Sequence, residues 1–220
     1  MAPGHGDILM AQDNRRPVRR HSTMVTRERL IRAAAELMAE RLSIDVSLSE
    51  IAQRSGLSAG LVQYHFGGKE ELLLAVADWV LESSTQKTRE LAASGISPRE
   101  KLSGFIRGLV LLYRDFPFLT HLTIFLTSRG TPEENAAMSR RLIQPVVDVL
   151  DAMLEEGRNS GAFKPVPTAH VYYMCVGACD GVFQRRHTVR HLFDADIASR
   201  DVQARYVASV QAVILDGLVS

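Results

Sequence analysis

The chain has 220 residues, enough for one large or two modest domains around a sizeable core. Lys and Arg number 26 against 25 Asp and Glu, so the net charge is only +1, and the hydrophobic fraction of 46% is ordinary for a globular protein. No apolar run reaches the roughly 18 residues of a membrane span, and none follows the N-terminal arginines. We therefore expect a cytoplasmic protein without a membrane anchor or a signal peptide.

Positive charge is concentrated near the N-terminus. Residues 15–69 contain nine Arg and one Lys against five Asp and Glu, a net charge of +5, so the rest of the chain sums to −4. This imbalance favours a nucleic-acid partner for the N-terminal quarter. Residues 1–22 have no helical period and are predicted to form a disordered basic arm. The arm is either a solvated tail or a contact to DNA phosphates and the minor groove, made by four arginines: Arg15, Arg16, Arg19 and Arg20.

The first predicted helix covers residues 26–42 and carries an apolar stripe at helical spacing. The next segment, SLSEIAQRSGLSAGLVQYHFGGK (residues 47–69), predicts two short helices joined by a tight turn. Ser47 and Glu50 have the spacing of a capping box, which satisfies the first amides of one helix. Gly56 ends that helix because glycine takes the left-handed backbone conformation at little cost.

Ser58 is a ready N-cap for the second short helix, residues 59–66. Two helices joined by a glycine-bearing turn are typical of a helix-turn-helix, whose second helix enters the DNA major groove. The same spacing also fits an ordinary αα-hairpin in a helical bundle. For a DNA reader, contacts are expected from nine residues: Ser47, Ser58, Ala59, Gly60, Leu61, Gln63, Tyr64, His65 and Lys69.

These residues divide by role. Ala59 and Gly60 are small enough to let the helix N-terminus approach the bases, and Leu61 can reach a thymine methyl group. The other residues mostly hold phosphates and fix the position of the helix along the groove.

Residues 26–77 resemble the DNA-binding domain of the TetR/AcrR family of transcriptional repressors. The resemblance lies in RERLIRAAAELMAE followed by LSEIAQRSGLSAGLVQYHFGGKEELLLAV, where several residue types stand at fixed spacing over about fifty residues. It implies an all-α fold of about nine helices. Residues 23–69 would be the helix-turn-helix domain, and residues 70–220 a helical ligand-binding and dimerisation domain.

A long helix is predicted over residues 69–93, and in this family that helix joins the two domains. The helices predicted after it cover residues 98–116, 118–129, 132–160, 168–187 and 199–218. Pro145 lies inside the third of these and should kink it or divide it at Gln144.

The last two predicted helices are apolar on more faces than one small domain covers. In the family they pair with their symmetry mates, which implies a homodimer through six residues: Tyr172, Gly177, Gly181, Tyr206, Val210 and Val213. Aromatic residues gather in the second domain, and either fill a plain core or line an apolar effector pocket. The predicted pocket residues are Trp79, Phe105, Tyr113, His121, Phe125 and Tyr173.

Metal and enzyme chemistry have little support. Cys175 and Cys179 stand at i, i+4 near His170 and Asp180, but two small apolar side chains in a buried interface explain the thiols better than a metal site. No phosphate loop, nucleophile elbow or zincin motif is present. We therefore predict no metal, no cofactor and no enzymatic activity.

The leading interpretation is a sequence-specific DNA-binding repressor. It would be released from a roughly palindromic operator by a small apolar or aromatic effector. Two alternatives remain open at this stage. One is a helical small-molecule sensor whose hairpin no longer reads DNA, and the other is an activator that shares all the same residues.

Overall fold

The structure, a computed structural model, describes residues 16–218, with side chains described from residue 24 onward. The prediction of an all-α fold is confirmed, since this part of the chain contains eleven helices and no strand. The helices are α1 (Arg16–Arg41), α2 (Leu48–Ser55), α3 (Ala59–Phe66), α4 (Lys69–Ala92), α5 (Pro98–Asp115), α6 (Leu119–Thr127), α7 (Pro132–Leu142), α8 (Gln144–Asn159), α9 (Thr168–Gln184), α10 (Arg186–Phe193) and α11 (Arg200–Leu218).

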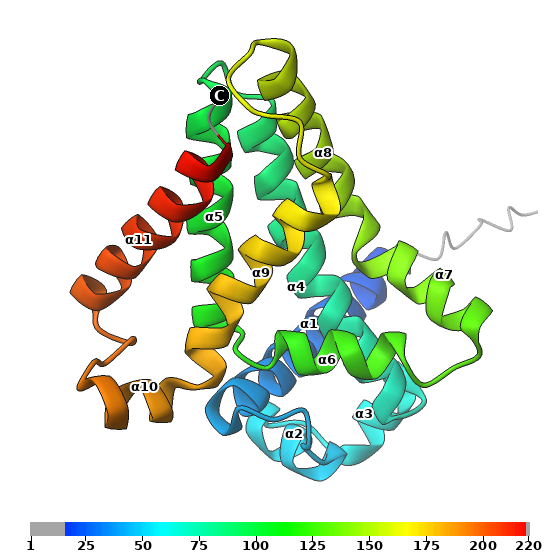
Figure 1. Cartoon of the computed structure of the whole chain (residues 1–220). Helices are drawn as coiled ribbons and strands as arrows, with labels where there is room; N and C mark the ends of the chain where they lie inside the picture. The colour runs from blue at the N-terminus through cyan, green and yellow to red at the C-terminus, as the bar shows by residue number, and fades with distance from the viewer. Residues whose placement is uncertain (1–15, 219–220) are drawn as a thin grey trace, which may run out of the picture.

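The helices are arranged as a small three-helix unit below a larger bundle. Figure 1 shows α1, α2 and α3 at one end of the molecule, with α4 running from them into the bundle. Within the bundle α5 is central, because it packs against α4, α8, α9 and α11. Helix α6 packs on α4 and α7, beside the three-helix unit. Helix α4 thus belongs to both parts, as expected of a linking helix.

Two differences from the sequence-based prediction concern helix boundaries, and one predicted break is confirmed. Helix α1 begins at Arg16, so residues 16–22 of the expected disordered arm have helical backbone, while residues 1–15 lie outside the described part of the chain. Pro17 in the first turn is compatible with this earlier start. The long helix predicted around Pro145 is divided into α7 and α8, as that proline indicated. The helix predicted over residues 168–187 ends at Gln184, and a separate α10 follows it.

Local capping explains where several helices begin. Capping boxes of the Ser/Thr-x-x-Glu type start α2, α5 and α7, and in the last two cases a proline occupies the first turn. At the other end of α2, Gly56 has φ 66°, a conformation that a residue with a Cβ rarely adopts. These signals act over four residues or fewer, which is why the sequence contains them in full.

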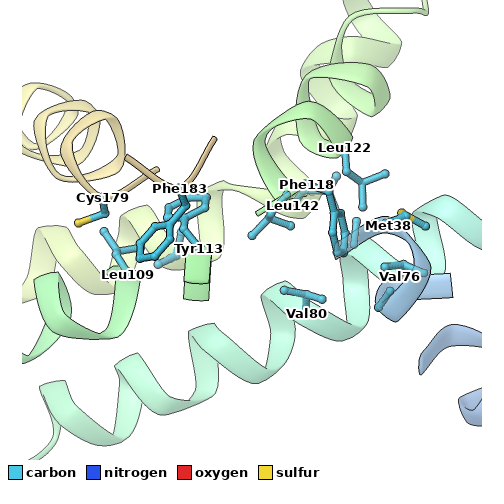
Figure 2. Close-up of a cluster of buried hydrophobic side chains, with 14 of the residues drawn as sticks. Met38, Val76, Val80, Leu109, Tyr113, Phe118, Leu122, Leu142, Cys179 and Phe183 are labelled. Carbon is cyan, nitrogen blue, oxygen red and sulfur yellow. The ribbon is translucent and has the colours of Figure 1, made fainter. Parts of the chain in front are cut away.

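A continuous apolar core joins the three-helix unit to the bundle. Phe118, at the start of α6, is completely buried. Figure 2 shows its ring close to Met38 of α1, Val76 of α4 and Leu122 of α6. Lys101 is also buried, and its Nζ lies 2.7 Å from a carboxylate oxygen of Glu156, so its charge is paired where α5 meets α8.

No single helix within residues 16–218 is both long and apolar enough to cross a membrane; α5 and α6 pass that test only as a pair, and they meet at 90°.

Candidate DNA-binding interface and regulatory domain

Helix α2 is fixed at its N-terminus by a hydrogen-bond network. The Ser47 hydroxyl accepts a bond from the Glu50 amide at 3.2 Å, and the Glu50 carboxylate accepts one from the Ser47 amide at 2.8 Å. Arg41, at the end of α1, donates to the same carboxylate at 2.6 Å. These bonds, chiefly that from Arg41, lower the pKa of Glu50 to about 2. The end of α1 therefore holds the start of α2.

Helix α3 has one buried and one open face. Ser58 caps it by accepting from the Leu61 amide at 3.3 Å, and Val62 and Phe66 are buried against the other helices. Arg27 of α1 lies over the Phe66 ring, 5.1 Å from its centroid, and helps to fix that end. Opposite, Tyr64 is 79% exposed, which leaves its ring and hydroxyl free to meet a partner.

The open face contains most of the residues predicted to contact DNA. Ser58, Ala59, Gly60, Gln63 and Tyr64 are exposed, with Leu61 and His65 at its margin. Gln63 departs from the expectation in one respect, because its amide donates to the Gly67 carbonyl at the end of α3. This bond uses one of the two N–H donors of the amide, so the second N–H and the carbonyl oxygen remain for a base or a phosphate.

Lys69, at the start of α4, is also engaged. Its Nζ lies 3.1 Å from a carboxylate oxygen of Asp45, in the connection between α1 and α2. Asp45 is 92% exposed at its side chain, so solvent weakens the attraction. The cation predicted for a phosphate is therefore present at the expected edge, but shared with a neighbouring carboxylate.

The residues predicted to line an effector pocket do not converge. Trp79 and Phe105 share a hollow of about 200 Å³ between α4 and α5. Phe125 borders a different hollow, under α6, where Arg129 lies over its ring at 4.5 Å. The other three lie elsewhere: one is buried and two are exposed on helix surfaces, namely Tyr113, His121 and Tyr173.

Tyr113 belongs to the interior between α5 and α9. Figure 2 shows it close to Leu109, Cys179 and Phe183, and burial raises the pKa of its hydroxyl. It is a core residue by every described contact. Its place in the sequence, among other aromatic residues, could not distinguish core from pocket.

The residues predicted for the dimer interface also divide between two faces. Tyr172 and Val210 are buried in the chain's own core. Tyr206 is half-buried and donates from its hydroxyl to the Ala178 carbonyl at 2.7 Å, which ties α11 to α9. Gly177 and Val213 are exposed, and Gly181 is half-buried.

Two further apolar residues near this surface were not expected there. Tyr173 is 70% exposed and Met174 48% exposed, both on α9, where the exposed Gly177 also lies. Val213 of α11 is likewise exposed, so α9 and α11 both present apolar side chains that no described residue covers. Only the direction of each side chain, which the fold decides, separates Tyr173 from its buried neighbour Tyr172.

The two thiols lie in the interior. Cys175 and Cys179 have no exposed surface, and burial raises the pKa of each to about 12. The Cys179 thiol lies 3.7 Å from the Ile106 carbonyl of α5. Among the side chains described, those of residues 24–218, no three His, Cys, Asp or Glu are grouped so that they could hold a metal ion.

Two family models match this architecture. Residues 95–220 match "Tetracyclin repressor-like, C-terminal domain", and residues 30–76 match "Bacterial regulatory proteins, tetR family". The chain belongs to the TetR family. The resemblance noted in the sequence is therefore confirmed, as are the helix-turn-helix followed by a helical domain and the function of a DNA-binding transcriptional repressor.

Two relatives of this TetR-family chain match it over nearly their whole length, although their sequence identity to it is low. The transcriptional repressor NicS from Pseudomonas putida is 23% identical over 209 residues, which cover 94% of this chain and 99% of NicS. The regulatory protein RaaS from Mycobacterium tuberculosis is 26% identical over 201 residues, 90% of each chain. The relatives are transcriptional regulators and not enzymes.

Solved structures show the same fold. FadR from Bacillus subtilis, solved in complex with stearoyl-CoA, has a TM-score of 0.63 and 21% identity, with 86% of this chain and 98% of that chain covered. A TetR-family regulator from Marinobacter aquaeolei has a TM-score of 0.65 and 20% identity, with 92% and 99% covered.

Besides the apolar core around Phe118, a cation–π contact joins the DNA-binding part of this TetR-family chain to the regulatory part. The Arg32 guanidinium of α1 lies over the Trp79 ring of α4, 5.5 Å from its centroid. The Phe116 ring meets Trp79 edge-on at 5.7 Å. Trp79 therefore lies between the DNA-binding unit and the hollow beside α5, a position that sequence spacing does not reveal.

Proposed function

We propose that this protein is a homodimeric repressor that acts in the cytoplasm, reads a roughly palindromic operator and leaves it when a small effector binds the second domain. The observation that carries the proposal is the open face of α3, which is capped at both ends and held by buried Val62 and Phe66. A small-residue N-terminus, Ala59-Gly60, permits close approach to base edges. Tyr64, Lys69 and the two capping serines would then contact phosphates.

Two-fold symmetry would place two copies of α3 in successive major grooves, about 34–36 Å apart. The exposed apolar residues of α9 and α11 supply a surface suited to a second copy. An effector would release DNA only if it binds the dimer with wrongly spaced α3 helices more tightly than the dimer whose α3 helices fit successive grooves.

The test begins with selection of DNA sites from a random duplex pool by the purified full-length protein. We expect recovery of an inverted repeat and a steep loss of affinity with rising salt, because bound cations displace counterions from phosphates. Tyr64→Ala should lower affinity for the selected site by tenfold or more, while Gln86→Ala, an exposed change in the middle of α4, should leave it unchanged.

The same experiment tests the alternative of a helical sensor whose hairpin does not read DNA. Recovery of no common sequence, together with weak binding that Tyr64→Ala does not alter, would establish that alternative and overturn the repressor. An activator would bind the same site but raise transcription from it, so a reporter assay separates the two.

A further inference from the structure

Two hollows lie on either side of the exposed ridge of α5. The first, between α4 and α5, is mainly apolar and includes Trp79, Phe105 and Phe116. The second, of about 720 Å³, lies between α5 and α11. Both hollows open on a part of the surface that no described helix covers.

The second hollow is positively charged. Three arginines border it, Arg107 and Arg114 from α5 and Arg200 from α11, against one carboxylate, Glu100. That carboxylate is already occupied, because it accepts bonds from the Ser97 amide at 3.0 Å and the Ser97 hydroxyl at 2.7 Å. The hollow therefore attracts anions.

Two of these arginines are free to take a ligand. Arg114 pairs with Asp115 at 2.7 Å. In the described part of the chain, neither Arg107 nor Arg200 has a carboxylate within ion-pair distance. A guanidinium suits a carboxylate or a phosphate, because it can donate two parallel hydrogen bonds to either group.

The two hollows adjoin one another along the ridge. Leu91, Gly104 and Leu111 border both of them. At Gly104 the ridge is covered by Leu91, whose Cδ2 lies 2.9 Å from the place of an added Cβ, whereas the position beside Gly108, one turn further along α5, is open space. Leu111 is 41% exposed and provides an apolar edge to the passage. An extended chain can thus cross from the apolar hollow to the cationic one beside Gly108 and over Leu111.

We propose that this continuous trough binds an amphiphile that has an apolar chain and a single acidic head group, a carboxylate or a phosphate. The chain lies along α4 and α5 over Trp79, and Arg107 and Arg200 hold the head. This inference rests on the proposed function insofar as the amphiphile is the effector. Its chain would lie against the Trp79 ring, which also contacts Arg32 of the DNA-binding unit.

The trough stays accessible in the proposed dimer. Ala204, Val207 and Gln211 border it and recur at intervals of three and four along α11, so they share one face of that helix. Tyr206 and Val213, seven residues apart, share another face, and Tyr206 is bonded to α9. A second copy that covers α9 and the Val213 face leaves the trough free.

Trp79 provides a direct readout, because it is the only tryptophan of the chain. We would titrate the full-length protein with decanoate, decyl phosphate, decanol and decyltrimethylammonium below micelle-forming concentrations, and follow tryptophan emission. Both anions should bind at least tenfold more tightly than decanol, and the cation should not bind. Each methylene added to the carboxylate should tighten binding about fourfold, because each is removed from water. The ratio of the affinities for decanoate and decyl phosphate identifies the preferred head group.

Two variants test the two halves of the trough separately. The double change Arg107→Gln with Arg200→Gln should weaken decanoate binding about tenfold and leave decanol binding unchanged. Gly108→Leu should fill the apolar hollow and weaken both ligands, and it should fold normally because nothing lies within 4 Å of the new Cβ. Arg205→Gln, an exposed α11 residue away from the trough, is the matched control and should change nothing.

Equal affinity for decanoate and decanol, or unchanged decanoate affinity in the double variant, would overturn the proposed site. The site would also be overturned if the wild type binds no anion and the double variant changes its oligomeric mass. That result would assign the trough to contacts between copies of the chain. Anion binding that leaves the complex with the selected DNA intact supports the site but refutes effector release. Failure to bind any DNA refutes the repressor alone, because the emission titration needs no DNA.

Discussion

Truncation of Phe118 would measure the packing that joins the DNA-binding unit to the regulatory domain. The ring is completely buried and lies against Met38, Val76 and Leu122, which come from three different helices. Phe118→Ala removes the whole ring, and neighbours on three helices cannot all move in to close the gap. We expect a loss in the free energy of unfolding of about 3–5 kcal/mol, a large part of the about 5–15 kcal/mol typical of a domain.

The assay is urea unfolding followed by far-ultraviolet circular dichroism at one fixed protein concentration, because dimer formation adds to apparent stability. Ile124→Ala is the matched control, since Ile124 is also an apolar residue of α6 but is 56% exposed. Its loss should stay below about 1 kcal/mol. A loss below about 1 kcal/mol for Phe118→Ala as well would refute the inference that this ring holds the two parts together.

Three further predictions follow from the site. Asp45→Asn should strengthen DNA binding because it frees Lys69, while Lys69→Gln should weaken binding and lower the salt slope by about one. The pKa of Glu50 is lowered from 4.5 to about 2 in the folded state. Its ionised form therefore stabilises the fold above about pH 4.5, and this contribution is lost as the pH falls toward 2. Over that range the melting temperature of Glu50→Gln should fall less than that of the wild type. Cys175 and Cys179, with pKa values of about 12, should resist thiol reagents at neutral pH until the protein is unfolded.

Each of these has a clear contrary outcome. If Asp45→Asn and Lys69→Gln weaken DNA binding equally, the ion pair itself positions the interface and Lys69 does not hold a phosphate. An unchanged acid sensitivity in Glu50→Gln would show that its bonds to Arg41 and Ser47 contribute nothing to the folded state. Rapid labelling of the native thiols would contradict the burial of α9.

Local chemistry made most of the helix boundaries predictable. The Ser47–Glu50 capping box, the left-handed Gly56 and the break before Pro145 each depend on residues within one helical turn, so the sequence contains all the information. The same holds for the open face of α3, because helical spacing alone separates buried Val62 and Phe66 from Tyr64.

The sequence by itself determined the family, the all-α class and the face of α3 that is offered to DNA. Only the tertiary structure decided which aromatic residues border a hollow and which fill the core, since Trp79 and Tyr113 differ in what other helices place beside them. It also decided that Arg107 and Arg200, which lie far apart in the sequence, border the same hollow. Periodicity orients side chains about one helix axis, but contacts between helices depend on packing between segments far apart in the chain.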